Sequence, residues 1–150
     1  MNTNRKLTIA LVAHDMRKVD MVEWTVFNAN FLSHHHLICT GTTGGLICEA
    51  FAEKGIRAEI TRMNSGPMGG DAEIAALVVR KQVDLAIFLI DDLNAQPHEA
   101  DIQMLLRQCR IHNVPIACNR YSADLMITST LWDDKLYNPT EPKYVQFKRG

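Results

Sequence analysis

The sequence predicts an α/β fold, a single three-layer, doubly wound parallel sheet of the flavodoxin-like class. The chain has 150 residues, 47% of them apolar, which is enough material for one compact core. Short apolar runs without a two-residue alternation recur along it, as expected for strands that are covered on both faces. Stretches with apolar residues three or four apart separate these runs. Parallel neighbouring strands need a crossover between them, and a helix supplies it.

The expected elements alternate along the chain. We expect strands at residues 7–13, 37–40, 56–60, 85–90 and 114–118. We expect helices at residues 17–32, 43–54, 72–81, 101–112 and 122–130. In the first helix Trp24, Phe27 and Phe31 recur at helical spacing, so they are expected in the core. From about Leu131 the chain carries prolines and mixed charge, which predicts an extended C-terminal tail, residues 131–150, on one domain that spans residues 1–150.

Composition and charge argue against several classes of partner. The 16 basic and 17 acidic residues nearly cancel and form no basic stripe, so no nucleic acid is expected. No apolar run has the length that a bilayer requires, so no membrane partner is expected. The run 7–13 breaks at His14 without a cleavage-like site and is predicted to be a strand, not a signal peptide. Four cysteines without a CxxC pair fit reduced thiols in a cytoplasmic protein.

Polar and glycine-rich segments follow the first four expected strands. In open α/β sheets ligands bind beyond the carboxyl ends of the strands, so these segments should face one crevice. They supply His14, Asp15 and Lys18, then Thr40, Gly41, Thr42 and Thr43, then Ser65, Gly66 and Asp71, and finally Asp91, His98 and Asp101.

The turn Thr-Gly-Thr-Thr-Gly-Gly at residues 40–45 leads into an expected helix. Its backbone N–H groups, its hydroxyls and the helix dipole would together bind a phosphate or a carboxylate. The alternative is that threonine only caps the helix and glycine only makes the turn. The turn matches neither the GxxxxGK[ST] nor the GxGxxG pattern. Ser65, Gly66 and Lys18 could contribute to the same anion site.

Asp71 follows two glycines at the start of an expected helix. One interpretation is an N-cap, the usual role of an aspartate so placed. The other is a general base, because the two glycines let the backbone approach a ligand closely.

His98 and Asp101 stand three residues apart, on one face of a helix that begins near Pro97. A carboxylate beside the imidazole would fix its tautomer, and a neutral imidazole can donate to a carbonyl oxygen during enolisation. The alternative is an exposed first-turn histidine near a dipole-favourable aspartate. A metal site built from His98, Asp101, Asp91 and His14 or Asp15 has no supporting motif such as HExxH, so no metal is expected.

Four motifs occur in order along the chain: Leu-Val-Ala-His-Asp at 11–15, Thr-Gly-Thr-Thr-Gly at 40–44, Ser-Gly-Pro-Met-Gly-Gly-Asp at 65–71 and Leu-Asn-Ala-Gln-Pro-His at 93–98. Together they resemble the methylglyoxal synthase family. The resemblance covers residues 7–127. It implies a methylglyoxal synthase-like fold and a cofactor-free carbon–oxygen lyase. Such an enzyme converts dihydroxyacetone phosphate (glycerone phosphate) to methylglyoxal and inorganic phosphate through an enediolate, in a bypass of glycolysis.

The resemblance also implies roles for individual residues. Asp71 would be the catalytic proton acceptor and donor, with His98 and Asp101 as further catalytic groups and Asp15 and Asp91 as supporting acids. The implied substrate-binding residues are His14, Lys18, Thr40, Gly41, Thr42, Thr43, Ser65, Gly66 and His98. It further implies a homo-oligomer, with a hexamer favoured, that inorganic phosphate inhibits.

The chain departs from the family pattern in two places. Asp92 stands where the family usually has proline, and the tail after Leu131 follows the family poorly, although Arg149 is a candidate for a C-terminal arginine of the family. Two other functions stay open. One is a non-catalytic regulatory module of the same fold that binds a phosphorylated effector, and the other is a triose phosphate isomerase.

Overall fold

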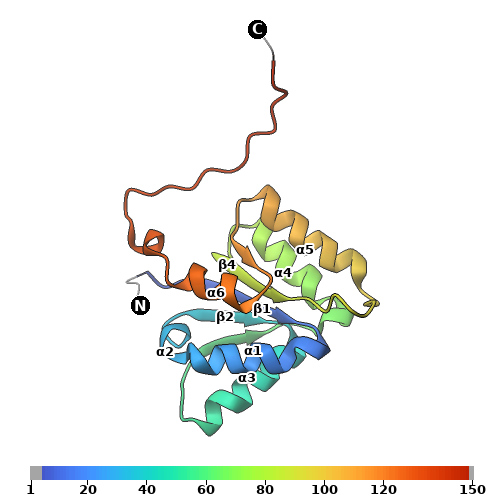
Figure 1. Cartoon of the computed structure of the whole chain (residues 1–150), viewed down its shortest axis with the longest axis vertical. Helices are drawn as coiled ribbons and strands as arrows, with labels where there is room; N and C mark the ends of the chain where they lie inside the picture. The colour runs from blue at the N-terminus through green and yellow to red at the C-terminus, as the bar shows by residue number, and fades with distance from the viewer. Residues whose placement is uncertain (1–4, 149–150) are drawn as a thin grey trace.

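The computed structural model describes residues 5–148, in which a five-stranded parallel sheet is flanked by helices (Figure 1). The strands are β1 (Thr8–Ala13), β2 (His36–Cys39), β3 (Glu59–Arg62), β4 (Leu85–Leu89) and β5 (Ile116–Ala117). The helices are α1 (Lys18–Phe27), α2 (Ala29–Leu32), α3 (Gly41–Glu53), α4 (Gly70–Val79), α5 (Glu99–Ile111) and α6 (Arg120–Ile127). Three 3-10 turns complete the described elements: η1 (Asp15–Arg17), η2 (Gly66–Met68) and η3 (Thr130–Asp133).

The strand order is β3-β2-β1-β4-β5, and every pairing is parallel. The predicted doubly wound class is therefore confirmed. Flavodoxin itself has the order 2-1-3-4-5, so the agreement is in the class and not in the strand order. Strands β2 and β3 are added on one side of β1, whereas β4 and β5 lie on its other side. The order of the strands therefore reverses between β1 and β4. Ligands of such sheets bind at this switch point, beyond the carboxyl ends of the strands.

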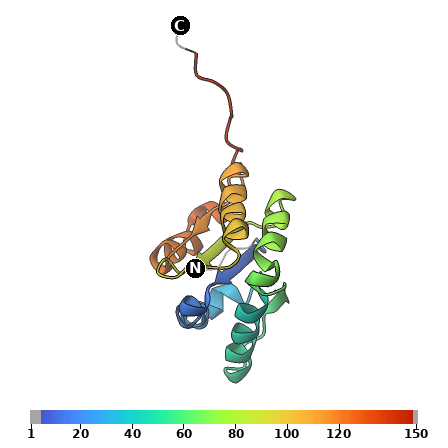
Figure 2. The same cartoon turned by 90° about the vertical axis from the view of Figure 1, so that its right-hand side faces the viewer.

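Two apolar clusters cover the two faces of the sheet. Ile9 and Leu11 of β1 pack with α1, α3 and α6, whereas Ala10 and Val12 of the same strand pack with α4 and α5. Figures 1 and 2 show α4 and α5 side by side, apart from α1. The three predicted layers are thus present. Both faces of β1 and β4 are buried, which explains why their sequences lack alternation.

The observed bounds differ from the expected ones where polar residues begin or interrupt an element. The expected helix 17–32 is divided into η1, α1 and α2, with the break at Asn28, whose side-chain amide donates to the Trp24 carbonyl at 3.0 Å. Trp24 and Phe31 are buried, but the expectation for Phe27 is wrong, because 83% of it is exposed. The third strand is at Glu59–Arg62 instead of 56–60. It is a largely exposed edge strand, so an apolar run does not mark it.

From Asp134 to Lys148 the chain forms neither helix nor strand. Its first part lies against the ends of α4 and α5, where Glu141 pairs with Lys81 at 2.8 Å and Asn113 donates to the Thr140 carbonyl at 2.7 Å. Beyond this point it extends away from the sheet in both views (Figures 1 and 2). Arg149 lies outside the described residues. Within residues 5–148, none of the helices has the length and apolar character needed to span a membrane.

Candidate active site

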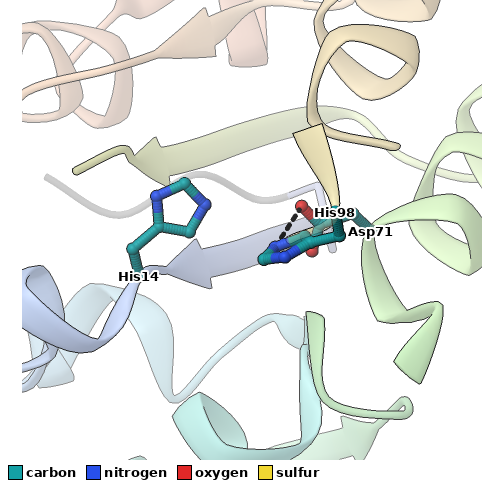
Figure 3. A group of neighbouring side chains, drawn as sticks. All are labelled: His14, Asp71 and His98. Carbon is teal, nitrogen blue, oxygen red and sulfur yellow. Dashed lines mark ion pairs between the residues drawn. The ribbon is translucent and has the colours of Figure 1, made fainter. Parts of the chain in front are cut away.

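Three side chains from different elements meet at the switch point of the sheet: His14 after β1, Asp71 in the first turn of α4, and His98 before α5 (Figure 3). Their exposed fractions are 4%, 0% and 8%. His98 Nε2 lies 3.5 Å from Asp71 Oδ2, and one ligand atom from each of the three side chains lies within 4.8 Å of the others. The His14 and His98 rings meet edge to face, with centroids 5.5 Å apart. The sequence-predicted convergence of strand ends thus brings three titratable groups into one buried cluster.

Asp71 is not the N-cap of α4, so that alternative is wrong. The N-cap is Gly69, which has a φ of +102°, and Asp71 is the second helical residue. Gly70 lies so close to the preceding loop that a Cβ there would be 2.0 Å from the Asn64 carbonyl oxygen. Neither carboxylate oxygen of Asp71 has a hydrogen-bond partner among the described residues. Burial raises the pKa of Asp71, and the nearby His98 opposes this effect.

His98 occupies the N-cap position of α5, and both of its buried ring nitrogens lack a hydrogen-bond partner in the described part of the chain. The ring therefore donates no hydrogen bond to the Asp101 carboxylate among the described residues, so the expected orientation of His98 by Asp101 is not observed. Asp101 acts on the cluster through its charge, because it contributes to the raised pKa of Asp71. Gly66 closes the cluster from the η2 side. A Cβ at Gly66 would lie 2.9 Å from His98 Nε2 and 3.1 Å from Asp71 Oδ1.

His14 is held by a main-chain group. Its Nδ1 accepts a hydrogen bond of 2.8 Å from the Asp91 backbone N–H, and its ring meets Phe88 edge to face at 5.3 Å. Since Nδ1 accepts, the proton of the neutral ring is on Nε2. That nitrogen is buried and unpaired within the described residues. Burial is the largest cause of a lowered pKa of His14, and the charge of His98 adds to it.

The spacing of His14, Asp71 and His98 would suit a metal ion, but the chemistry of His14 does not. A ligating histidine normally donates its other ring N–H to an acceptor, whereas the other nitrogen of His14 accepts a bond from an N–H. The larger metal set considered from the sequence is not assembled either. Asp91 binds the main chain of its own loop, and the Asp15 side chain is 95% exposed.

The predicted anion turn lies at the start of α3. Thr40 is the N-cap residue, but its side chain forms no capping bond with the described backbone. Its hydroxyl donates to that of Thr43 at 3.3 Å, and the Thr43 hydroxyl donates to the Ala13 carbonyl at the same distance. Gly41 N donates to the Asn64 carbonyl at 3.0 Å, which brings the loop of Ser65 against the turn. The first turn of a helix leaves amides without intrahelical acceptors, so the turn can bind an anion.

The remaining predicted residues surround the cluster. Lys18 Nζ donates to the Ala13 carbonyl at 3.0 Å and to Asp15 Oδ1 at 2.7 Å. This hydrogen bond from Lys18 is the main cause of the lowered pKa of Asp15. Asp91 accepts from the Leu93 and Asn94 backbone amides and from the Asn94 side chain, and these bonds lower its pKa. The side chains of Asp15 and Asp91 therefore organise their own loops, and only the backbone N–H of Asp91 binds a member of the buried cluster.

Comparison with known proteins identifies one family. The model of the MGS-like domain family matches residues 20–118. "Methylglyoxal synthase" of Treponema socranskii is 70% identical over 145 residues, which are 97% of this chain and 92% of the relative. The chain belongs to the methylglyoxal synthase family. A relative of the same name from Coxiella burnetii (strain Dugway 5J108-111) is 44% identical over 140 residues, 93% of this chain and 94% of that protein.

A solved structure supports the family and the fold together. The crystal structure of methylglyoxal synthase from Elizabethkingia anophelis NUHP1 superposes with a TM-score of 0.80 at 40% identity, over 93% of this chain and 88% of that one. Members of the methylglyoxal synthase family are lyases, so the predicted enzyme class is confirmed. The range matched by the family model spans the positions of Asp71, His98 and the anion turn. His14 and Lys18 precede this range and are covered by the longer alignment with the Treponema socranskii relative.

Sequence reasoning missed two contributors to the site. One is the backbone N–H of Asp91, which binds His14 and which no side-chain pattern reveals. The other is Arg17, which donates to the Ile90 carbonyl at 3.0 Å. Arg17 lies next to Lys18 in the polar segment after β1, and this position could have marked it as a candidate site residue.

Proposed function

We propose that this member of the family converts dihydroxyacetone phosphate to methylglyoxal and inorganic phosphate through an enediolate, as a bypass of glycolysis. One observation carries the proposal. Asp71 is a fully buried carboxylate without a hydrogen-bond partner in the described chain, and it faces His98 across 3.5 Å. Burial raises the pKa of Asp71, which makes it a stronger base towards a carbon-bound proton than an exposed carboxylate.

The substrate phosphate binds at the turn 40–43, at the start of α3. The first-turn amides of Thr42 and Thr43 have no backbone acceptor among the described residues there, and the hydroxyls of the turn can reorient towards the anion. Ser65 and Gly66 add a hydroxyl and an amide from the adjoining loop, and Lys18 adds a positive charge. The closeness of the two loops, through the bond from Gly41 N to the Asn64 carbonyl, supports a shared anion site. Phosphate held there leaves the three-carbon chain within reach of the buried cluster.

Asp71 removes a proton from the carbon beside the carbonyl group. His98 donates to the carbonyl oxygen and stabilises the enediolate where its charge develops, and His14 binds the substrate beside it. Asp101 helps to keep Asp71 basic through its negative charge. Elimination then requires the C–O bond to lie roughly perpendicular to the enediolate plane, so the anion site must hold the phosphate out of that plane. The leaving phosphate is a stable anion, so the reaction needs no cofactor.

The test is product analysis with chelator-treated protein. We expect equal amounts of methylglyoxal and inorganic phosphate from dihydroxyacetone phosphate, and we expect Asp71→Asn to bind substrate without turnover. The matched control is Glu49→Gln, which neutralises an exposed carboxylate on α3 and should keep full activity. Glyceraldehyde 3-phosphate as the product would indicate an isomerase. Binding of phosphorylated ligands without turnover by the unaltered chain would indicate a regulatory module.

We also propose that the protein is a cytoplasmic homo-oligomer, with a hexamer favoured, and that inorganic phosphate inhibits it by competing for the anion site. Exposed apolar side chains support self-association: Val19 and Phe27, eight residues apart on α1, are 71% and 83% exposed. Burial of these two side chains against another subunit would remove their apolar surface from water. Light scattering tests the oligomer, and competition against substrate tests the inhibition.

A further inference from the structure

One peptide group beside the site is hydrogen-bonded at both ends. The carbonyl of Ile90 accepts from Arg17 Nη1 at 3.0 Å. The N–H of Asp91, which belongs to the same peptide unit, donates to His14 Nδ1 at 2.8 Å. A cation, a peptide and an imidazole thus form a continuous chain, and its last atom, His14 Nε2, is buried beside Asp71 and His98.

Arg17 is fixed in this position by further contacts. Its guanidinium lies 3.3 Å from Asp20 Oδ2, and its own backbone N–H donates to the His14 carbonyl at 2.8 Å. Asp20 also contacts Arg120, whose Nη1 lies 3.5 Å from Oδ1. Among the described residues Arg120 donates to Asp20 and Glu23 and not to the Ile90–Asp91 peptide.

We propose that Arg17 is a positioning residue that acts through the Ile90–Asp91 peptide to hold His14 as the neutral Nε2–H tautomer, ready to donate to the substrate. The tautomer itself does not depend on the proposed function. Its catalytic consequence does, because it assumes that a substrate oxygen lies beside His14 Nε2.

The physical basis is polarisation of the peptide. A guanidinium at the carbonyl oxygen withdraws electron density and makes the N–H a stronger donor, as in other hydrogen-bonded chains. A ring nitrogen that accepts this bond cannot also carry a proton, so the bond favours the neutral ring. A neutral histidine can donate a hydrogen bond from Nε2–H to a carbonyl oxygen. The same hydrogen bond stabilises the negative charge that develops on this oxygen in the enediolate.

Other charged groups also face His14 and must be kept constant in a test. His98 and Lys18 favour its neutral form, whereas Asp91 and Glu99 favour its protonated form. Asp71 lies within the same cluster. None of these groups touches the Ile90 carbonyl in the described structure, so a change at Arg17 alone alters the polarisation of that peptide.

The experiment compares Arg17→Met, Arg17→Lys and the matched control Arg120→Met by ¹⁵N NMR of the ligand-free protein. The His14 signals are identified by their loss in His14→Gln. We expect the Nε2–H tautomer in the unaltered protein and in Arg120→Met. In Arg17→Met we expect a mixture of tautomers and a higher pKa of His14, and in Arg17→Lys a return towards the original state. An unchanged His14 spectrum in Arg17→Met, or an equal change in Arg120→Met, would refute the proposal.

Kinetics provide the second readout. In Arg17→Met the acid limb of the kcat/KM profile should move to higher pH, with about a 10-fold loss at pH 6, a part of what one positioned acid–base group contributes. Arg17→Lys should recover most of it. Absence of lyase activity in the unaltered protein would refute the proposed function but leave the NMR result valid. If Arg17→Met does not fold, Arg17→Gln replaces it, and an unchanged His14 tautomer there would equally refute the proposal.

Discussion

At the scale of single residues, Gly66 shows how little free space the site contains. A Cβ at this position would lie 2.9 Å from His98 Nε2 and 3.1 Å from Asp71 Oδ1, closer than van der Waals contact allows. We expect Gly66→Ala to displace one or both groups and to lower kcat by about 10²-fold, the cost of a displacement of about 1 Å. Steady-state kinetics measure the loss, and circular dichroism checks that the variant is folded.

Gly55→Ala is the matched control for this substitution. Gly55 follows α3, has a φ of +67°, and a Cβ there would meet no atom within 4 Å. Alanine should therefore cost about 1 kcal/mol of stability through backbone strain and leave kcat unchanged. A Gly66→Ala variant with the kcat of the unaltered protein would show that Asp71 and His98 need not hold their observed positions.

The sequence predicted correctly which side chains meet when their position after a strand is enough to place them. Asp71, His98 and His14 follow different parallel strands, and parallel strands end at one edge of the sheet. The sequence did not predict the hydrogen bonds that orient the individual side chains. Asp101 was expected to bind the His98 ring from its spacing, yet α5 begins at Glu99 and leaves His98 as the non-helical N-cap. The bond from the Asp91 amide to His14 joins residues 77 apart and has no side-chain signature.

At the scale of elements, the start of α4 decides where the proposed base lies. A Cβ at Gly70 would be 2.0 Å from the Asn64 carbonyl oxygen and 3.0 Å from that of Ser65, and neither main-chain atom can rotate away. We expect Gly70→Ala to force α4 away from this loop, at a cost of about 1–3 kcal/mol, typical of overpacking. Activity should fall together with stability, because Asp71 is the next residue and would move with the start of α4. Urea unfolding and kcat on the same samples test both effects.

Gly45→Ala is the corresponding control within a helix. A Cβ there would approach Arg62 Nη2 at 2.8 Å, but this atom is the end of a flexible, exposed side chain that can move. Alanine has a higher helix propensity than glycine, so stability should be unchanged or rise by up to about 1 kcal/mol. If Gly70→Ala were as stable as Gly45→Ala, the contact between α4 and the Asn64 loop would not constrain the helix.

Buried strands were easier to predict from the sequence than exposed ones. β1 and β4 are covered on both faces and were recognised as apolar runs, whereas β3 is exposed and its apolar residues did not mark its bounds. Helices α3, α4, α5 and α6 each begin about two residues before the expected start. Each of these helices begins with a glycine or a charged residue, which carries no apolar periodicity. The first turns of α3 and α4 and the N-cap of α5 also belong to the candidate site.

At the scale of the whole molecule, the buried cluster places function in conflict with stability. The core on both faces of the sheet is apolar, and Asp71 brings an ionisable group with unpaired oxygens into its edge. Burying a carboxylate without compensating hydrogen bonds costs free energy, which the rest of the fold must offset. Removal of the charge at this position should therefore affect the stability of the whole chain in a pH-dependent manner.

We expect Asp71→Asn to abolish turnover and yet to raise the free energy of unfolding at pH 7 by about 1 kcal/mol, or Tm by ~2–4 °C for a chain of this length. Burial raises the pKa of Asp71 above the ordinary value of 3.8, so the folded state resists ionisation more than the unfolded state. At a pH above the folded-state pKa, the buried carboxylate destabilises the folded protein to the full extent, and this destabilisation declines as the pH falls through that pKa towards 3.8. The gain in stability of Asp71→Asn over the unaltered protein should therefore decline over the same pH range. Urea unfolding at several pH values, with Glu49→Gln as the exposed control expected to stay within about 0.5 kcal/mol, measures this difference. A variant less stable than the unaltered protein at pH 7 would mean that the folded state stabilises the Asp71 carboxylate, contrary to its proposed role as an unpaired base.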